Sequence, residues 1–269
     1  MLTVVIAVLA GLAVGFGLAL SDVLGYGWSS FCGVLSFGAV QFGLGFVLQR
    51  KVKAAMIAVQ AVLADGQKRL QAKTARWQMR PPSSIKEAQN EIARDQRVFV
   101  TEALALTEPL KRFNLWVPLM SRQIATAQFQ LRWMIKDFKA VDELMPKALF
   151  LDPTSTAMKL ARMQMTNAPI ADMEKVYKKG CARLKYNQNV LLAATWSWIL
   201  LKRGDADAAF KALNAALKNS DNETLKANRE HLANNRLAHF SNAGLGDQWY
   251  ALLLEEPKIR MQRQRMQWR

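Results

Sequence analysis

The chain has 269 residues, enough for one or two domains, and 37 Lys and Arg against 21 Asp and Glu give it a formal charge of +16. Its two cysteines and two histidines lack the spacing of a disulfide framework or a metal site. The charge is segregated, with a net +7 in residues 50–80, a net +5 in residues 258–269 and only Asp22 in the first 49 residues. This distribution favours an anionic surface as the partner and argues against a uniformly basic domain.

Residues 1–49 are predicted to form a transmembrane helical hairpin. Leu2 to Leu20 and Phe31 to Leu48 are almost wholly apolar, and each is about long enough to cross a bilayer as a helix. The turn between them has no Lys or Arg, whereas Arg50, Lys51 and Lys53 follow the second run at once. The positive-inside rule then predicts two spans in an inner (plasma) membrane, with the C-terminal domain cytoplasmic. A cleaved signal peptide and a buried soluble hairpin are the alternatives.

Small residues recur every four positions on the first apolar run, at Ala7, Gly11, Gly15 and Ala19. Such a stripe lets a neighbouring helix approach closely. We expect it to pack against the second helix of the same hairpin, where Ala39 and Gly43 supply a matching face. Dimerisation within the membrane is the alternative.

Residues 50–118 are predicted to form a basic helical stalk and an antiparallel helix. Helical signals continue to Met79, with an apolar seam that includes Gly66. Pro81-Pro82 ends this helix, and Ser84-Ile85-Lys86-Glu87 is a capping box that begins the next one. Contact with anionic lipid headgroups is expected at Arg50, Lys51 and Lys53. The apolar residues Leu115, Trp116 and Val117 are expected to tuck under the helices that follow.

Residues 119–257 show a 34-residue period. Asp137, Ala171 and Asp205 are 34 residues apart, as are Ala148, Ala182 and Ala216. With the Gly204-Asp205 turn and the closing Asp152-Pro153, this period resembles the tetratricopeptide (TPR) repeat. The resemblance implies antiparallel helix pairs that begin near Gln123, Ala157 and Leu191, and a fourth pair around Gly246-Asp247. The middle repeat departs from the pattern, with Pro169 in its turn and Lys175 where a small residue is usual.

The expected fold class is therefore all-α, an N-terminal two-helix transmembrane hairpin followed by a TPR-like α-solenoid. Two N-terminal membrane helices before repeats also look like the layout of the inner-membrane TPR proteins encoded with heme-biosynthesis enzymes.

In TPR proteins the first helix of each pair lines a concave groove that binds a partner protein. The resemblance transfers this role to Gln123, Thr126, Gln130, Trp133, Leu160, Gln164, Leu191, Ala194, Trp198 and Leu201. These positions hold no cation, which argues against the carboxylate clamp of co-chaperone TPR proteins. An apolar groove with two tryptophans suits an amphipathic helix. The alternative is that Trp133 and Trp198 are ordinary core residues, covered by the chain's own helix over residues 85–106.

Residues 258–269 form a basic tail that contains Arg260, Arg263, Arg265 and Arg269 and ends in Trp268-Arg269. It is either solvated or bound to anionic lipid, and nucleic acid ranks behind both as a partner. No phosphate-binding or nucleophile motif is present. His231 and His239 are eight residues apart, beyond the spacing at which one helix face shares a metal. We expect no enzymatic activity, catalytic residue, cofactor or metal ligand.

These features together predict a membrane-anchored protein–protein interaction scaffold that recruits or assembles a partner at the cytoplasmic face of the membrane. Two alternatives remain open. One is an accessory subunit of a membrane enzyme complex, docked through the small-residue stripe. The other is an RNA- or ribosome-associated membrane protein that acts through its basic tail.

Overall fold

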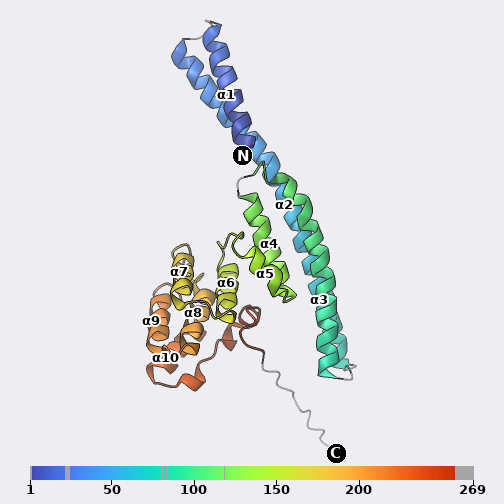
Figure 1. Ribbon diagram of the computed structural model, residues 1–269, viewed down its shortest axis with the longest axis vertical. Coiled ribbons are helices and arrows are strands. Elements are labelled where there is room, and N and C mark those ends of the chain that lie inside the picture. Colours follow the sequence, from blue (N-terminus) through green and yellow to red (C-terminus); the bar gives the residue numbers. More distant parts are fainter. Residues whose placement is uncertain (1, 22–24, 80–81, 83, 118, 258–269) are drawn as a thin grey trace, which may run out of the picture. The chain divides into compact units, whose positions relative to one another are not determined.

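The computed structural model describes residues 2–21, 25–79, 82, 84–117 and 119–257, and every regular element in these ranges is helical (Figure 1). The predicted all-α class is therefore confirmed. The chain forms two compact units that divide between Leu149 and Phe150. The first predicted helix pair falls in the N-terminal unit and the later pairs fall in the C-terminal unit, so each unit is described by itself.

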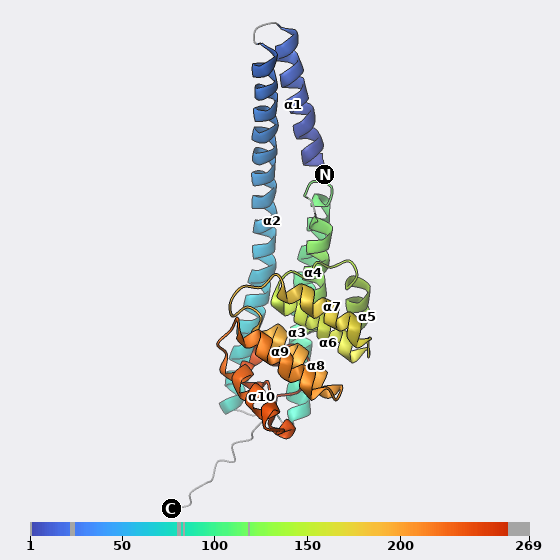
Figure 2. The ribbon, with the colours of Figure 1, turned by 90° about the vertical axis from the view of Figure 1, so that its left-hand side faces the viewer.

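The N-terminal unit is dominated by two long helices. It contains α1 (Leu2–Leu20), α2 (Tyr26–Met79), α3 (Ile85–Thr107), the 3-10 helix η1 (Glu108–Phe113), α4 (Met120–Met134) and α5 (Phe138–Leu144). Figure 2 shows α2 as one unbroken helix, with α1 lying beside its first part. Both α1 and the apolar portion of α2 are long and apolar enough to cross a membrane.

The 54 residues of α2 join the predicted second span and the predicted basic stalk in a single helix. This continuity follows from the sequence, because no proline interrupts residues 26–79. The apolar side chains of the first part give way to Arg50 and Lys51 without a break in the helix. The expectation that the second apolar helix continues into the basic segment is confirmed.

Helix α3 begins at the predicted cap, where the Ser84 side chain accepts a hydrogen bond from the backbone N–H of Glu87. It returns along α2 and buries Val59, Phe99, Val100 and Ala103 together with Leu131 of α4. Gly66 lies at a close approach between the two helices. A Cβ atom there would come within 2.3 Å of the Phe99 ring, so the ring fills the space that the missing side chain leaves.

A second apolar cluster joins η1 and the start of α4 to α2. Its buried members are Leu110, Phe113, Met120 and Ile124, and Leu48, Val52 and Met56 of α2 pack against them. The cluster therefore sits where the apolar run of α2 ends and its basic run begins.

In the part of the chain that the structure describes, the C-terminal unit contains two complete helix pairs, one further helix and a short closing segment. The helices are α6 (Pro153–Met165), α7 (Ile170–Cys181), α8 (Val190–Lys202), α9 (Ala206–Leu217) and α10 (Glu223–Ala233), followed by η2 (Leu237–His239), η3 (Ala243–Leu245) and α11 (Asp247–Tyr250). Helix α8 is the centre of this unit, because every residue from Leu191 to Leu200 is buried. It contacts α6, α7 and α9.

The 34-residue period has a partial structural basis. Asp137 and Asp205 are the N-caps of α5 and α9, where their side chains accept hydrogen bonds from the N–H groups of Ala140 and Ala208. In the middle repeat Pro169 takes the equivalent place, and it makes no side-chain cap. The fourth pair is incomplete, because the second helix predicted at Gly246-Asp247 is the single turn of α11.

The small residues of the period follow the same pattern. Ala148 and Ala216 are buried, whereas Ala182 is exposed. The close approach in the middle repeat occurs instead at Gly180, where a Cβ atom would lie 2.8 Å from Leu192 and 3.0 Å from Thr156. The small residue that allows the helices to approach is therefore Gly180, two residues before Ala182, the position that the 34-residue period indicates.

Candidate functional site

The predicted groove residues of the first helix pair all lie on α4 of the N-terminal unit. Gln123 is exposed, Gln130 is half-buried and Trp133 is 1% exposed. Thr126 has a structural task, because its hydroxyl accepts a hydrogen bond from the Leu149 N–H at 2.8 Å and lies 3.0 Å from the Leu149 carbonyl. Trp133 stacks on Phe129 and meets the Phe138 ring edge-on. The large apolar side chains of this helix therefore face the interior of the unit.

The remaining predicted groove residues belong to α6 and α8 of the C-terminal unit. Leu160, Leu191 and Ala194 are buried, and Trp198 is 8% exposed. Gln164 is half-buried and accepts a hydrogen bond from the Arg203 guanidinium at 3.0 Å, while Leu201 is half-buried. The burial of Trp133 and Trp198 favours the alternative in which both are core residues. The two sets lie in separate units.

Trp198 belongs to an aromatic cluster in which one carboxylate joins two indoles. Its ring meets Trp249 at a centroid distance of 5.9 Å. The Glu255 carboxylate accepts hydrogen bonds from Nε1 of Trp198 at 2.7 Å and from Nε1 of Trp249 at 2.8 Å. Because a buried indole N–H needs an acceptor, Glu255 fastens the segment after α11 onto α8. Sequence reasoning missed this contact, since nothing in the spacing of these residues marks it.

The small-residue stripe of α1 packs within the hairpin as expected, but against a different face of α2. Ala7 and Gly11 are buried, and Gly15 and Ala19 are half-buried. A Cβ atom added to Gly11 would lie 2.8 Å from the Gly33 carbonyl oxygen, and one added to Gly33 would lie 2.8 Å from that of Gly11. The predicted matching face of Ala39 and Gly43 was wrong, because both are exposed. The partner face contains Ser29, Gly33 and Phe37, a four-residue series that points in another direction around the helix.

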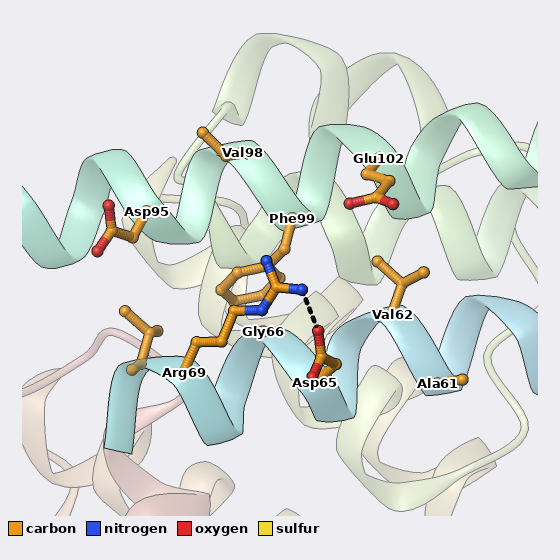
Figure 3. Close-up of a pocket in the computed structure, with 10 residues that line it drawn as sticks. Ala61, Val62, Asp65, Gly66, Arg69, Asp95, Val98, Phe99 and Glu102 are labelled. Atoms are coloured by element: carbon orange, nitrogen blue, oxygen red, sulfur yellow. Dashed lines mark ion pairs between the residues drawn. The ribbon is translucent and has the colours of Figure 1, made fainter. Parts of the chain in front are cut away.

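An accessible groove lies on the stalk, between α2 and α3 (Figure 3). It has a volume of about 540 Å³. Val62, Gly66 and Phe99 form its apolar floor, and Val98 stands beside it with 65% of its surface exposed. Its rim carries both signs of charge: Asp65 and Arg69 form an ion pair at 2.6 Å, and Asp95 and Glu102 lie on α3. An apolar floor between charged edges is the surface that an amphipathic helix needs.

The stalk is held together by charge as well as by apolar contacts. The Lys73 ammonium lies 2.6 Å from Asp95 and 3.2 Å from Glu91, so one cation of α2 joins two carboxylates of α3. The hydrogen bond to Asp95 raises the pKa of Lys73, so the cationic form persists in alkaline solution.

The free thiol of Cys181 and the two histidines are described groups that bear on reactive chemistry. Burial raises the pKa of the Cys181 thiol, which is the opposite of the shift that activates a nucleophilic cysteine. His231 and His239 are closer than their spacing implied, because the chain turns after α10 and brings the ring centroids to 5.6 Å. No third His, Cys, Asp or Glu joins them, and in the part of the chain that the structure describes no such group is placed to hold a metal.

The predicted anionic-surface residues divide between described and undescribed parts. Arg50, Lys51 and Lys53 are exposed on α2 directly after its apolar run. Arg260, Arg263, Arg265 and Arg269 lie outside the described residues.

The segment Leu115–Val117 does not tuck under the following helices as a unit. Leu115 is 68% exposed, and Trp116 and Val117 are half-buried. Leu119 is 54% exposed and has a φ of 62°, a left-handed conformation that a leucine adopts only under constraint.

No protein-family model matches the chain, and searches of curated proteins and of solved structures likewise gave no match. The TPR resemblance therefore rests on the residue pattern and on the helix pairs alone.

Proposed function

We propose that the protein is a membrane-anchored scaffold that holds another protein at the cytoplasmic face of the membrane. The observation that carries this proposal is the continuity of α2, which is apolar enough to span a membrane in its first part and forms the basic stalk in its second. A helix without a break transmits position and orientation from the bilayer to everything packed on it. The anchor and the stalk are therefore one mechanical element.

The proposed orientation follows from the charges that flank the apolar helices. The described cations nearest to the apolar run of α2 are Arg50, Lys51 and Lys53, and all three are exposed. Because cytoplasmic loops carry the excess of Lys and Arg, the stalk, the helices packed on it and the C-terminal unit lie in the cytoplasm in this proposal. The same three residues are placed to contact anionic headgroups.

The proposed contact for the partner is the groove between α2 and α3. The tryptophans predicted to line a TPR groove are buried, whereas the groove between α2 and α3 exposes Val98, with Phe99 and Gly66 buried beneath it. A partner helix with apolar residues at i, i+3, i+4 and i+7 fits this floor. Its flanking charges meet a rim that holds Asp65 and Arg69 on one side and Asp95 and Glu102 on the other.

Photocrosslinking in native membranes tests the scaffold. A photoreactive side chain at Val98 is expected to yield one abundant crosslinked protein that mass spectrometry identifies. The same group at Ala93, which is exposed on α3 but does not line the groove, provides the matched control. Equal and diffuse crosslinking from both positions would count against the groove as the binding surface.

A second candidate is an accessory subunit that docks inside the membrane. It is favoured by a hollow of about 660 Å³ on the hairpin, lined by Gly11, Gly15 and Gly33 together with exposed apolar residues such as Val34. In this case a complex isolated in mild detergent survives removal of residues 150–257. In the scaffold proposal the complex depends on Val98 and tolerates changes in the hollow.

A further inference from the structure

The loop that follows η1 is bonded to the start of the first apolar helix. The backbone N–H of Leu2 donates to the Leu115 carbonyl at 2.9 Å, and the Thr3 hydroxyl donates to the Trp116 carbonyl at 3.1 Å. The first N–H groups of a helix have no partner within it. Two groups at the start of α1 are thus satisfied by a loop that is more than a hundred residues away in the sequence.

The same loop is fixed at the end of the apolar run of α2. Phe113 and Met120, which flank it, are buried in the cluster to which Leu48 and Val52 contribute. Leu48 is the last apolar residue before Gln49 and Arg50. The loop is therefore held at one level along the hairpin, where α1 begins and the apolar run of α2 ends.

At this level the loop presents apolar side chains outward. Leu115 is 68% exposed and Leu119 is 54% exposed, and Trp116 beside them is half-buried. Leu119 is held in a left-handed conformation at the N-cap of α4, a geometry that keeps it out of the adjacent cluster. Exposed leucines on one short loop, with a half-buried tryptophan beside them, form an apolar surface that is a candidate interaction site.

Several cations lie within a few residues of these leucines in the sequence. Arg112 and Arg122 are exposed on either side of the loop. Arg122 lines a surface hollow together with Asn114 and Lys111, and Lys111 is paired with Glu108 at 2.5 Å. An apolar tip with a tryptophan and flanking arginines is the composition that lies at the boundary between acyl chains and headgroups.

We propose that Leu115, Trp116 and Leu119 form an interfacial membrane anchor that inserts the two leucines into the leaflet from which α2 emerges, with Arg112 and Arg122 on anionic phospholipid headgroups. This inference rests on the proposed membrane anchoring of α1 and α2. The interfacial loop adds a third contact with the same leaflet, so the stalk cannot rotate freely about the axis of the hairpin.

The test uses the full chain in vesicles that contain neutral and anionic phospholipid. Single cysteines replace Leu115, Val34 or Val98 in a Cys32→Ala/Cys181→Ala background and carry an environment-sensitive fluorophore. Val34 lies in the apolar run of α2 and reports the bilayer, whereas Val98 is equally exposed on the stalk and reports water. Lipids with a nitroxide at the headgroup or along the acyl chain serve as quenchers.

The expected result is a blue-shifted emission at Leu115 that headgroup and upper-chain nitroxides quench, with no quenching at Val98. Water-like emission at Leu115 with normal quenching at Val34 would overturn the interfacial anchor and leave the membrane hairpin standing. Absence of quenching at Val34 would overturn the hairpin anchor and this inference together. A blue shift at Leu115 that no lipid quenches would show that protein covers the loop, which also overturns the proposal.

The contact with headgroups is tested by a double variant and a matched control. Arg112→Gln/Arg122→Gln is expected to reduce quenching at Leu115 in anionic vesicles to the level seen in neutral ones. Lys211→Gln/Lys218→Gln removes the same charge from α9 and its C-cap residue and is expected to leave the quenching unchanged. Quenching that does not depend on anionic lipid in the unmodified chain would overturn the headgroup contact.

Discussion

Helix α2 packs against two partners along its length, and the two contacts are built in different ways. In the hairpin, Gly33 of α2 meets Gly11 of α1, and each missing Cβ atom makes room for a backbone carbonyl. In the stalk, Gly66 of α2 makes room for the ring of Phe99, with the Lys73 ion pairs beside it. One glycine thus permits contact between backbones, and the other forms a socket for a side chain.

The difference corresponds to the solvents that the two parts are proposed to face. Between helices in lipid, burial of apolar surface gives no driving force, so close packing of small residues is what remains. In water, burial of an aromatic ring is favourable in itself. A large buried side chain therefore stabilises the stalk, whereas the absence of a side chain stabilises the hairpin by allowing close packing. Substitutions at the two contacts should separate these contributions.

The largest effect is expected from Phe99→Ala in the stalk. Removing a buried phenylalanine costs about 3–5 kcal/mol, because the socket at Gly66 is left empty. Hydrogen exchange measured by mass spectrometry should show faster exchange in α2 and α3 around this contact. Val98→Ala, the adjacent and largely exposed position, is the control and should change exchange little. Equal effects of the two substitutions would show that Phe99 does not anchor the stalk.

The next largest effect is expected from Gly33→Leu in the hairpin. Its side chain would collide with the Gly11 carbonyl oxygen, a backbone atom that cannot rotate away, and overpacking of this kind costs about 1–3 kcal/mol. Spin labels at Leu12 and Val34, which line the same hollow, should move apart. Gly38→Leu is the matched control, since a Cβ atom there meets open space. Separation in both variants would indicate a general loss of the fold.

A smaller effect is expected from Gly66→Ala. The added methyl group crowds the Phe99 ring at a cost of about 1–3 kcal/mol, and the better helix propensity of alanine offsets about 1 kcal/mol of that. The neighbour here is a side chain that can shift, so Gly66→Ala should disturb its contact less than Gly33→Ala disturbs the hairpin. Hydrogen exchange of the two alanine variants shows which contact is disturbed more. A larger disturbance by Gly66→Ala than by Gly33→Ala would contradict the proposed difference between the two contacts.

The smallest effect is expected from the charges of the stalk. Because the hydrogen bond to Asp95 raises the pKa of Lys73 above 10.5, its stabilising contribution is fully present below that ordinary value. The contribution is lost as pH rises through the higher pKa of the folded state. Hydrogen exchange is too fast at such pH, so helicity by circular dichroism is the measurement. Lys73→Met should flatten the alkaline loss of helicity, and an unchanged curve would exclude Lys73 as its cause.

Much of the N-terminal unit could be predicted, because its signals are local. The apolar runs, the absence of proline over residues 26–79 and the Ser84 cap each act within a few turns of helix. The partner face of the α1 stripe could not be predicted, since it depends on how α2 is rotated about its axis. Ala39 and Gly43 are small and spaced four residues apart, as the contact requires, but Gly33 is the residue on the side of α2 that faces α1.

The candidate groove shows a similar limit in the C-terminal unit. The spacing predicted where α6, α8 and α9 begin to within a few residues. It could not tell which face of α8 is covered, because α8 is apolar on all sides and buried from Leu191 to Leu200. The contact of Trp198 with Glu255 also joins residues with no common pattern. Exposure of Leu115 was missed because apolar residues are assigned to the interior by default.

Because α2 is one continuous helix, a tilt of its apolar part also tilts the stalk. At 1.5 Å per residue the part beyond Leu48 extends about 45 Å, so a tilt of about 20° would carry its far end sideways by about 15 Å. Helices tilt when a bilayer becomes thinner than their apolar length. A partner held beside Val98 would thus be displaced whenever bilayer thickness changes. In the proposed orientation, a change in membrane thickness would therefore change the position of the bound partner.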